Sequence, residues 1–366
     1  MVNKNISSLN LSITTRCNLD CDYCYLRGLK SEDMSLKTAC TAIDKLHPDT
    51  IIFYGGEPLL KFELINDIVE YAKRKYRIKK FMIVTNGTLF SKKIVDFMQS
   101  NDFRIIISLD GERKSHDAHR KFLNGQSSYD VIFNNIMLLK SYGINPGINY
   151  TVNYNTIVGM ATNVHALICK HKVNVNLGYV IDEKKITSKY KKMYENEMIK
   201  FTNIYLSKML FMRMININPF DIYFFKLLEN KMTDRNLFRL RCNMDGRLTV
   251  MPDGTLYPCN TCMSLPKKHL QKCILGNIFS KDDFLSRYFY FVENFKLNDL
   301  IVIKHKKFQN SNRVCLLSSK NPIERLEFEM RIMNVVVGIF KKYINEFSSS
   351  KGLKELCKHK KQIIFN

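Results

Sequence analysis

Residues 17–24 read Cys17-Asn18-Leu19-Asp20-Cys21-Asp22-Tyr23-Cys24, and the rest of the chain is interpreted outward from this stretch. Three cysteines fall within eight residues, directly after a β-rich run at residues 9–14 that predicts a strand. Thiolates in one loop can converge on a single metal centre. In a 4Fe–4S cluster each iron takes one cysteine, so three cysteines leave one iron with an open coordination site.

Such an open iron can chelate the amino and carboxylate groups of a methionine and pass an electron to a neighbouring sulfonium. A structural zinc site is the alternative. Zinc sites favour paired CxxC units with a fourth ligand nearby, whereas this stretch contains no histidine. The spacing therefore favours an iron–sulfur cluster and leaves zinc as the second interpretation.

The first half of the chain alternates short β-rich runs with segments whose apolar residues recur at three- and four-residue spacing. Six strands are predicted, at residues 9–14, 50–54, 80–85, 104–109, 147–152 and 173–180. Helices are predicted between them, at residues 36–46, 59–76, 92–99, 129–142 and 157–171. This order predicts an α/β fold with a parallel sheet and right-handed crossovers. Six units fit a partial (β/α)6 TIM-like barrel, with the active site at the carboxyl ends of the strands.

The pattern changes after about residue 182. A charge-rich stretch at 184–192 is expected to be solvated, and later helices are predicted at 194–214, 220–231 and 323–347. Residues 247–250 and 255–257 flank Met251-Pro252-Asp253-Gly254, which predicts a hairpin with glycine where positive φ is needed. We expect three domains: a barrel core at 1–185, a helical linker region at 186–240, and a C-terminal α+β module with terminal helices at 241–366.

The formal net charge is +23, from 57 Lys+Arg against 34 Asp+Glu. Such a field would attract nucleic acid, an anionic membrane or an acidic peptide. The excess is mostly lysine alongside many asparagines and isoleucines, which is typical of a genome-wide composition bias, and no nucleic-acid-binding motif accompanies it. Nucleic acid is therefore not the expected partner.

The chain has 11 cysteines and no signal peptide or apolar run long enough to span a bilayer. An odd cysteine count without an export signal argues against a disulfide framework. We expect a cytoplasmic protein without a membrane partner, in which clustered cysteines bind metal.

The motif Cys17-x3-Cys21-x2-Cys24, with aromatic Tyr23 before the last cysteine, resembles the signature of the radical S-adenosylmethionine (radical SAM) superfamily. The resemblance implies a 4Fe–4S cluster and S-adenosylmethionine as cofactors, with Tyr23 near the adenine. Gly55-Gly56-Glu57-Pro58 follows the second predicted strand and is similar to the glycine-rich segment that binds the amino group of this cofactor. Glycines there let backbone approach a ligand closely, and Glu57 can accept a charge-assisted hydrogen bond from an ammonium.

Further matches occur in the same order as in the family. Thr85-Asn86-Gly87 ends the third predicted strand, Ser108-Leu109-Asp110-Gly111 ends the fourth, and Arg120 follows. This run resembles the subgroup with a C-terminal extension for auxiliary clusters. The resemblance implies cofactor contacts for Asn86, Ser108, Asp110 and Arg120. A turn role for Asp110 and a surface ion pair for Arg120 remain open.

The segment from Cys242 to Cys259 around the hairpin is similar to the auxiliary-cluster modules called SPASM and twitch domains. The later dense run of cysteines in a full SPASM domain has no counterpart here. We therefore expect one auxiliary 4Fe–4S cluster, with Cys242 and Cys259 as ligands and Cys262, Cys273 and Cys315 competing for the remaining places. A zinc site or a structural role for the later cysteines is the alternative.

The resemblance implies an enzyme that cleaves S-adenosylmethionine to a 5′-deoxyadenosyl radical and modifies a ribosomally made peptide or protein by crosslinking or oxidation. Asn260 stands where sulfatase-maturing relatives have an aspartate base, which weakens that particular activity. Because the first predicted strand begins near residue 9, an N-terminal peptide-recognition domain is not expected, and a separate protein can supply recognition. An external reductant of the flavodoxin or ferredoxin type is also implied. The alternatives are a small-molecule radical dehydrogenase or cyclase, and a non-catalytic iron–sulfur or zinc protein.

Overall fold

The computed structural model describes residues 6–154, 156–179, 187–209, 217–218, 224, 227, 246–265, 267–294 and 322–347. These residues fall into two compact units. The first unit comprises Met1–Ile107, His119–Pro146 and Arg241–Lys320, and the second comprises Ser108–Ala118, Gly147–Leu240 and Asn321–Asn366. The domain boundaries expected at residues 185 and 240 lie outside the described residues and stay predictions.

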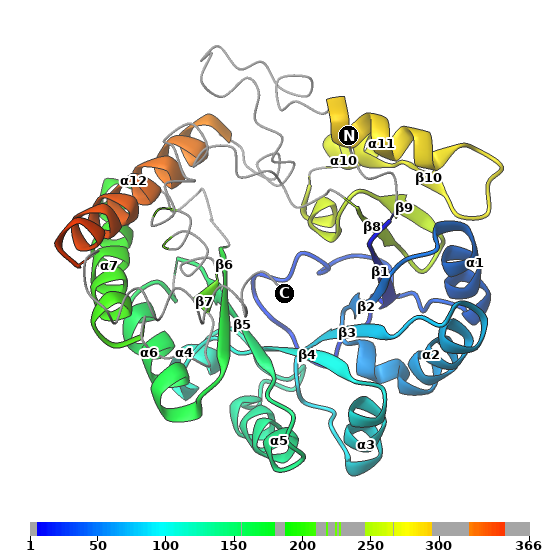
Figure 1. Cartoon of the computed structure of the whole chain (residues 1–366), viewed down its shortest axis with the longest axis horizontal. Coiled ribbons are helices and arrows are strands. Elements are labelled where there is room, and N and C mark those ends of the chain that lie inside the picture. Colours follow the sequence, from blue (N-terminus) through cyan, green and yellow to red (C-terminus); the bar gives the residue numbers. More distant parts are fainter. Residues whose placement is uncertain are drawn as a thin grey trace. The chain divides into compact units, whose positions relative to one another are not determined.

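The first unit is built on parallel strands with helices between them, drawn from blue to cyan in Figure 1. Its strands are β1 (Ser8–Thr14), β2 (Thr50–Gly55), β3 (Lys80–Thr85) and β4 (Phe103–Ser108), paired in that order. Its helices are α1 (Leu36–Leu46), α2 (Phe62–Tyr76), α3 (Lys92–Ser100) and α5 (Tyr129–Ser141), with a short turn η1 (Pro58–Lys61) before α2. The strand and helix positions expected from the sequence are confirmed, with ends that differ by at most three residues.

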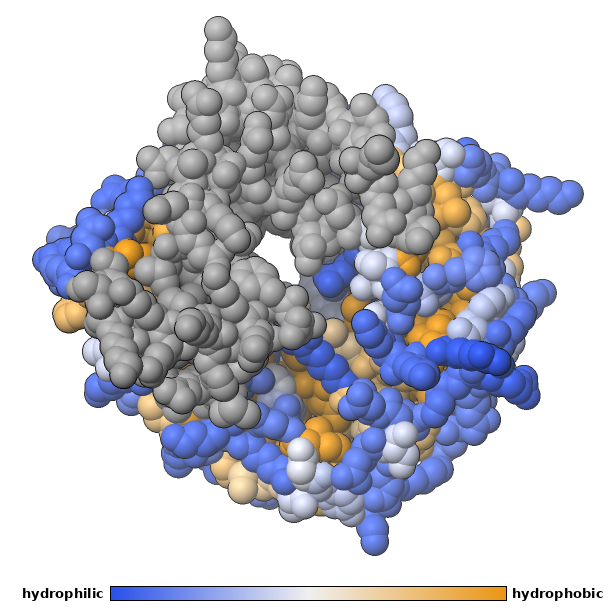
Figure 2. Space-filling view, in the orientation of Figure 1, coloured by the Kyte–Doolittle hydropathy of each residue, from blue (hydrophilic) through white to orange (hydrophobic). Residues whose placement is uncertain are grey.

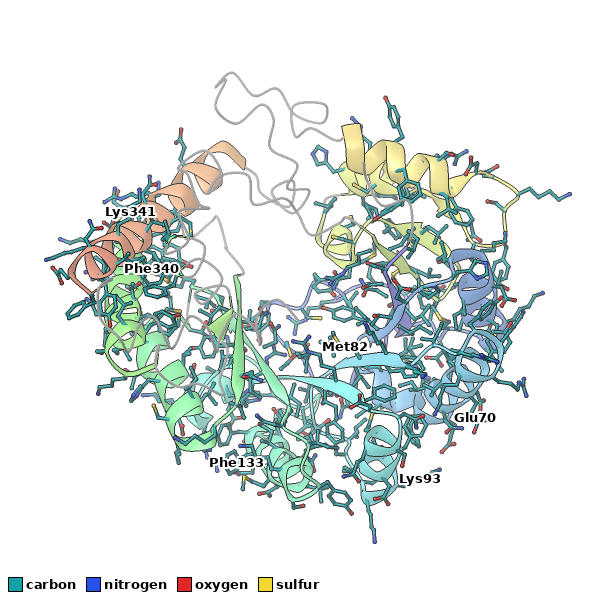
Figure 3. The ribbon with its side chains drawn as sticks, in the orientation of Figure 1. Glu70, Met82, Lys93, Phe133, Phe340 and Lys341 are labelled. Atoms are coloured by element: carbon teal, nitrogen blue, oxygen red, sulfur yellow. The ribbon has the colours of Figure 1, made fainter. Side chains whose placement is uncertain are left out.

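Two helices of the first unit, α1 and α3, begin at a capping serine side chain. Ser35 accepts a hydrogen bond from Thr38 N at the start of α1, and Ser91 accepts one from Ile94 N at the start of α3. Such caps satisfy amide groups that a helix leaves without internal partners. In Figure 3, Glu70 of α2 and Lys93 of α3 project from the outer surfaces of their helices.

The strand β1 is buried on both faces, and the two faces differ in character. Leu9, Leu11 and Ile13 are fully buried apolar residues, whereas Asn10 and Thr14 alternate with them as buried polar residues. Side chains of a strand alternate between its faces. One face of β1 is therefore apolar, and the other carries buried polar side chains.

The C-terminal hairpin belongs to the same sheet. Strand β8 (Arg247–Val250) pairs in parallel with β1, and β9 (Thr255–Tyr257) and β10 (Gly276–Asn277) follow in antiparallel order. The predicted hairpin is confirmed, with Gly254 at φ +84°. Three short helical turns and a helix complete the segment: η4 (Asn260–Ser264), α10 (Lys267–Leu270), η5 (Gln271–Cys273) and α11 (Phe284–Asn294). The hairpin therefore extends the sheet beside β1.

The second unit has its own parallel strands, β5 (Gly147–Val152), β6 (Asn174–Tyr179) and β7 (Ile217–Asn218). Its helices are α4 (Arg113–Asp117), α6 (Met160–His171), α7 (Ser188–Ile204), the π-turn η3 (Tyr205–Met209) and α12 (Pro322–Phe347). Helices α7 and α12 lie side by side in Figure 1. Their contact includes Phe328 against Tyr190 and Tyr194, with ring centroids 6.1 and 5.2 Å apart.

Helix α7 begins earlier than the sequence predicts. The helix expected at residues 194–214 starts at Ser188, inside the charge-rich stretch at 184–192. Thr187 caps the helix by accepting from Tyr190 N, and Tyr190 is buried. Exposed lysines occupy the outward face of this turn, so its composition reflects one face of a helix rather than a loop.

Hydrophilic side chains dominate the described surface in the view of Figure 2. Within the described part of the chain, no helix combines the length and the apolar character that crossing a bilayer requires.

Candidate functional site

The loop after β1 carries the three early cysteines and is held in place by a second segment of the first unit. Asp20 N donates to Lys121 O at 2.9 Å, Asp22 N donates to His119 O at 3.3 Å, and Leu123 N donates to Asn18 O at 3.3 Å. Through these hydrogen bonds residues 119–123 lie across the cysteine loop, and we call this segment the strap. The strap fixes the loop backbone without using the cysteine side chains.

The cysteine side chains meet N–H donors. Leu19 N lies 3.4 Å from Cys17 Sγ, and Asn86 Nδ2 lies 3.7 Å from the same sulfur. Arg120 Nη1 lies 3.7 Å from Cys21 Sγ. Burial raises the pKa of the Cys17 thiol. N–H groups directed at sulfur are one of the features by which a protein tunes a cluster held by thiolates.

Gly55 and Gly56 bring the end of β2 against the start of the cysteine loop. Gly56 N donates to Thr14 O at 2.8 Å. A Cβ at Gly55 would lie 2.3 Å from Thr14 O, and one at Gly56 would lie 2.1 Å from Arg16 O. Gly55 also has φ +133°, which other residues rarely adopt. The close approach that requires these two glycines is therefore to the chain's own backbone beside Cys17.

Glu57 is fully buried beside the same turn. Its Oε1 accepts from Leu59 N at 3.0 Å and from Thr85 Oγ1 at 2.7 Å, and its Oε2 accepts from Asn86 N at 2.7 Å. Burial raises its pKa to about 7 despite these hydrogen bonds. Glu57 thus ties the end of β3 to the η1 turn, and Pro58 opens that turn.

Arg120 and Tyr23 lie together next to Cys21. The Arg120 guanidinium carbon is 5.2 Å from the centroid of the Tyr23 ring, and Arg120 is 8% exposed. His119 Nδ1 lies 2.7 Å from Asp22 Oδ2. A buried guanidinium has to be paired to offset the loss of hydration. Arg120 is therefore a buried cation of the cysteine loop rather than a partner in a surface ion pair.

Ser108 and Asp110 belong to the second unit. Asp110 is fully buried and accepts from Thr151 N at 2.8 Å, while its own N–H donates to His116 Nδ1 at 3.2 Å. Asp110 thereby joins the segment after β4 to β5. Its predicted contact with the cofactor, and that of Ser108, stay predictions.

The later cysteines gather in the turns after β9. Cys259, Cys262 and Cys273 are all buried, and the Cys262 thiol forms side-chain hydrogen bonds with both of the others. These contacts raise the pKa of Cys262, while the contact with Cys262 lowers the pKa of Cys273. Cys242 and Cys315, also predicted as ligands, lie outside the described residues.

A cluster of two phenols and an amide was not predicted from the sequence. Tyr25, Tyr54 and Asn260 form side-chain hydrogen bonds with one another, and burial raises the pKa of both phenols. Tyr25 follows Cys24, Tyr54 precedes Gly55, and Asn260 follows Cys259. The cluster thus links the early cysteine loop to the later cysteine segment within the first unit. The one sequence feature that could have pointed to this group is that each of its three residues stands next to a motif residue in the chain.

Among the described residues, no three His, Cys, Asp or Glu side chains are arranged as ligands of one metal ion. At Cys17 and Cys21 the donor set is thiol sulfur surrounded by N–H groups, which fits an iron–sulfur cluster.

Comparison with known proteins gives consistent results. The sequence profile of the "Radical SAM superfamily" matches residues 11–164. "Uncharacterized protein MJ0907" of Methanocaldococcus jannaschii is 32% identical over 280 residues, which are 75% of this chain and 89% of that protein. A "Cysteine-type anaerobic sulfatase-maturating enzyme" of Clostridium novyi is 28% identical over 286 residues, 70% of this chain and 74% of that enzyme.

Among solved structures, "Native anSMEcpe with bound AdoMet and Kp18Cys peptide" has a TM-score of 0.67 at 22% identity, covering 90% of this chain and 98% of its own. This likeness concerns the fold. The expected fold class is confirmed: a partial α/β barrel with a parallel sheet and a C-terminal extension.

Proposed function

The chain belongs to the radical SAM superfamily of enzymes, and from this premise we propose that it matures a ribosomally made peptide or protein. The observation that carries the proposal is the cysteine loop after β1. Cys17, Cys21 and Cys24 share one strapped loop, N–H donors face two of the sulfurs, and Gly55-Gly56 abuts the same loop. We assign these three cysteines as ligands of a 4Fe–4S cluster with one open iron.

When bound, the cluster and S-adenosylmethionine supply a 5′-deoxyadenosyl radical. The residues around the loop bind and orient that cofactor. In this proposal Tyr23 contacts the adenine, and Gly55 to Pro58 and Asn86 lie at the methionine end. The buried guanidinium of Arg120 is suited to a carboxylate.

An auxiliary 4Fe–4S cluster is the second part of the proposal. Cys259, Cys262 and Cys273 are buried together, and thiols in mutual contact within a reducing compartment are suited to metal binding. Cys242 and Cys315 stay candidates for the remaining place.

The proposed substrate is a peptide or protein. A sulfatase-maturating enzyme is among the relatives, and one similar solved structure has AdoMet and a peptide bound. Asn260, a neutral amide, is no proton acceptor at neutral pH. We therefore favour crosslink or oxidation chemistry other than sulfatase maturation, with electrons from a flavodoxin- or ferredoxin-type reductant. A separate peptide-recognition protein can present the substrate.

The activity is tested by anaerobic reconstitution with iron and sulfide, followed by dithionite and S-adenosylmethionine. The wild-type protein is expected to form 5′-deoxyadenosine, and Cys21→Ala to form none above background. Cys40→Ala, in helix α1 away from the loop, is the matched control and should keep the wild-type rate. Formation of 5′-deoxyadenosine by Cys21→Ala at the wild-type rate would contradict the assignment of the three cysteines as cluster ligands.

The alternative function, a small-molecule radical dehydrogenase or cyclase, would be distinguished from a peptide maturase by its product. Mass spectrometry of a candidate precursor peptide, incubated with the active enzyme, is expected to show a loss of hydrogen mass. An unchanged peptide alongside a modified small metabolite would favour the alternative.

A further inference from the structure

Three side chains beside Cys17 form a closed ring of hydrogen bonds. Asn86 Nδ2 donates to Asn18 Oδ1 at 2.8 Å, and Asn18 Nδ2 lies 2.8 Å from Thr88 Oγ1. Thr88 Oγ1 lies 2.7 Å from Asn86 Oδ1 and completes the ring. Asn86 and Thr88 are buried, with 6% and 8% exposure.

One backbone group fixes the direction of every bond in this ring. Thr88 N donates to Asn86 Oδ1 at 2.9 Å, and a backbone N–H can only donate. The atom that it contacts must therefore be the amide oxygen of Asn86, so the opposite atom is the NH2 group. The Thr88 hydroxyl then donates to Asn86 and accepts from Asn18.

This orientation leaves a defined partner for each N–H of Asn86. One N–H donates to Asn18 Oδ1, and Nδ2 also lies 3.7 Å from Cys17 Sγ. Rotating the amide by 180° would place its oxygen against the sulfur and break the bond with Thr88 N. The ring therefore holds a donor, rather than an acceptor, toward Cys17.

We propose that Asn18 and Thr88 are positioning residues that hold the Asn86 amide so that its N–H donates to the Cys17 thiolate of the first cluster. The inference rests on the proposed function, because Cys17 has to be a cluster ligand. A hydrogen bond from nitrogen to a ligating sulfur stabilises the reduced, more negative cluster more than the oxidised one. The ring thus raises the reduction potential of the cluster that receives the first electron.

The test measures the midpoint potential of this cluster by potentiometric electron paramagnetic resonance in the absence of S-adenosylmethionine. The signal of the first cluster is identified beforehand as the one that changes when the cofactor is added. Thr88→Val keeps the shape but removes the hydroxyl, and it is expected to shift the potential to a more negative value. Thr88→Ser keeps the hydroxyl and should have the wild-type potential.

Asn18→Ala opens the ring from the other side and should shift the potential in the same direction. Asn86→Ala removes the donor itself and should give the largest shift. Thr249→Val is the matched control, because Thr249 is a buried threonine that accepts from an amide, Asn10 Nδ2, at 3.1 Å. Its potential should equal that of the wild type.

Wild-type potentials in both Thr88→Val and Asn18→Ala, at full iron content, would overturn the positioning role. That result leaves the proposed function standing if the wild-type signal responds to the cofactor. Absence of any responsive signal in the wild type would instead contradict the proposed function.

Discussion

Asp33 shows how single residues hold the cysteine loop in place. Its carboxylate accepts from Thr14 Oγ1 at 2.7 Å and pairs with Lys61 Nζ at 2.6 Å and with the Arg16 guanidinium. Partial burial acts to raise its pKa, but the hydrogen bonds from Lys61, Thr14 and Arg16 outweigh burial and lower the pKa to about 2. Asp33 thus joins the end of β1, the residue before Cys17 and the η1 turn.

Asp33→Asn is expected to lower the free energy of unfolding of the apoprotein by about 1–2 kcal/mol at pH 6. A carboxyl whose pKa is lower in the folded state stabilises it above the unfolded pKa, near 3.8, and this contribution is lost as the pH falls toward 2. The difference between variant and wild type in denaturant unfolding should therefore shrink between pH 6 and pH 2.5.

Asp67→Asn, at an exposed position of α2, is the control and should stay within about 0.5 kcal/mol of the wild type. A difference for Asp33→Asn that is the same at both pH values would contradict the assigned ion pairs.

The sequence identified some site residues and missed others for a physical reason. The spacing of Cys17, Cys21 and Cys24 is local, so it can be recognised in eight residues. Asn18 and Thr88 are 70 positions apart, and their hydrogen bond depends on how the ends of β1 and β3 lie in the sheet. No periodicity or spacing predicts a pairing of that kind.

At the scale of elements, the end of β2 and the start of the cysteine loop depend on close backbone contact. Gly56 N donates to Thr14 O, and Glu57 N donates to Arg16 O at 2.9 Å. These bonds hold the turn before η1 against the residue that precedes Cys17. The geometry of the loop is therefore sensitive to any added atom on Gly56.

Gly56→Ala is expected to lower stability by about 3 kcal/mol and to reduce the iron bound after reconstitution. The new Cβ would lie 2.1 Å from Arg16 O and 2.6 Å from Arg16 C, so the loop backbone must move. The thermal unfolding midpoint and the iron content measure the two effects.

Gly338→Ala provides the contrast, because Gly338 is exposed in α12 with nothing within 4 Å of an added Cβ. It should stabilise the protein by about 0.5–1 kcal/mol and leave iron binding unchanged. A normal iron content and unfolding midpoint in Gly56→Ala would show that the loop does not depend on this contact.

The strands β3 and β5 were predicted with their observed bounds, because buried strands have local apolar patterns. The pairing of β8 with β1 was not predicted, since residues 239 positions apart in sequence meet there. The start of α7 was missed because lysines on its exposed face obscured the buried Tyr190 and Tyr194. Local patterns thus gave the elements, and the long-range contacts came only from the folded chain.

At the scale of the whole molecule, we propose two clusters, one at each group of cysteines. Both groups lie in the first unit, one after β1 and the other after β9. With two clusters, a variant that lacks the first ligand set should still bind the iron of the second.

Changing Cys17, Cys21 and Cys24 together to alanine is expected to leave roughly four irons per chain after reconstitution. Adding Cys259→Ala, Cys262→Ala and Cys273→Ala should remove those as well, as measured by iron and sulfide analysis. An iron-free triple variant that folds as the wild type does would eliminate the auxiliary cluster.

The central claim is that three thiolates of one loop hold a cluster whose open iron binds the sulfonium cofactor. The most direct measurement is metal analysis and electron paramagnetic resonance of oxygen-protected, reduced protein before and after addition of S-adenosylmethionine. The account predicts iron and sulfide, with a cluster spectrum that changes on addition and does not change in the Cys17/Cys21/Cys24 triple variant. Zinc in place of iron, or a wild-type spectrum that is indifferent to the cofactor, would contradict it.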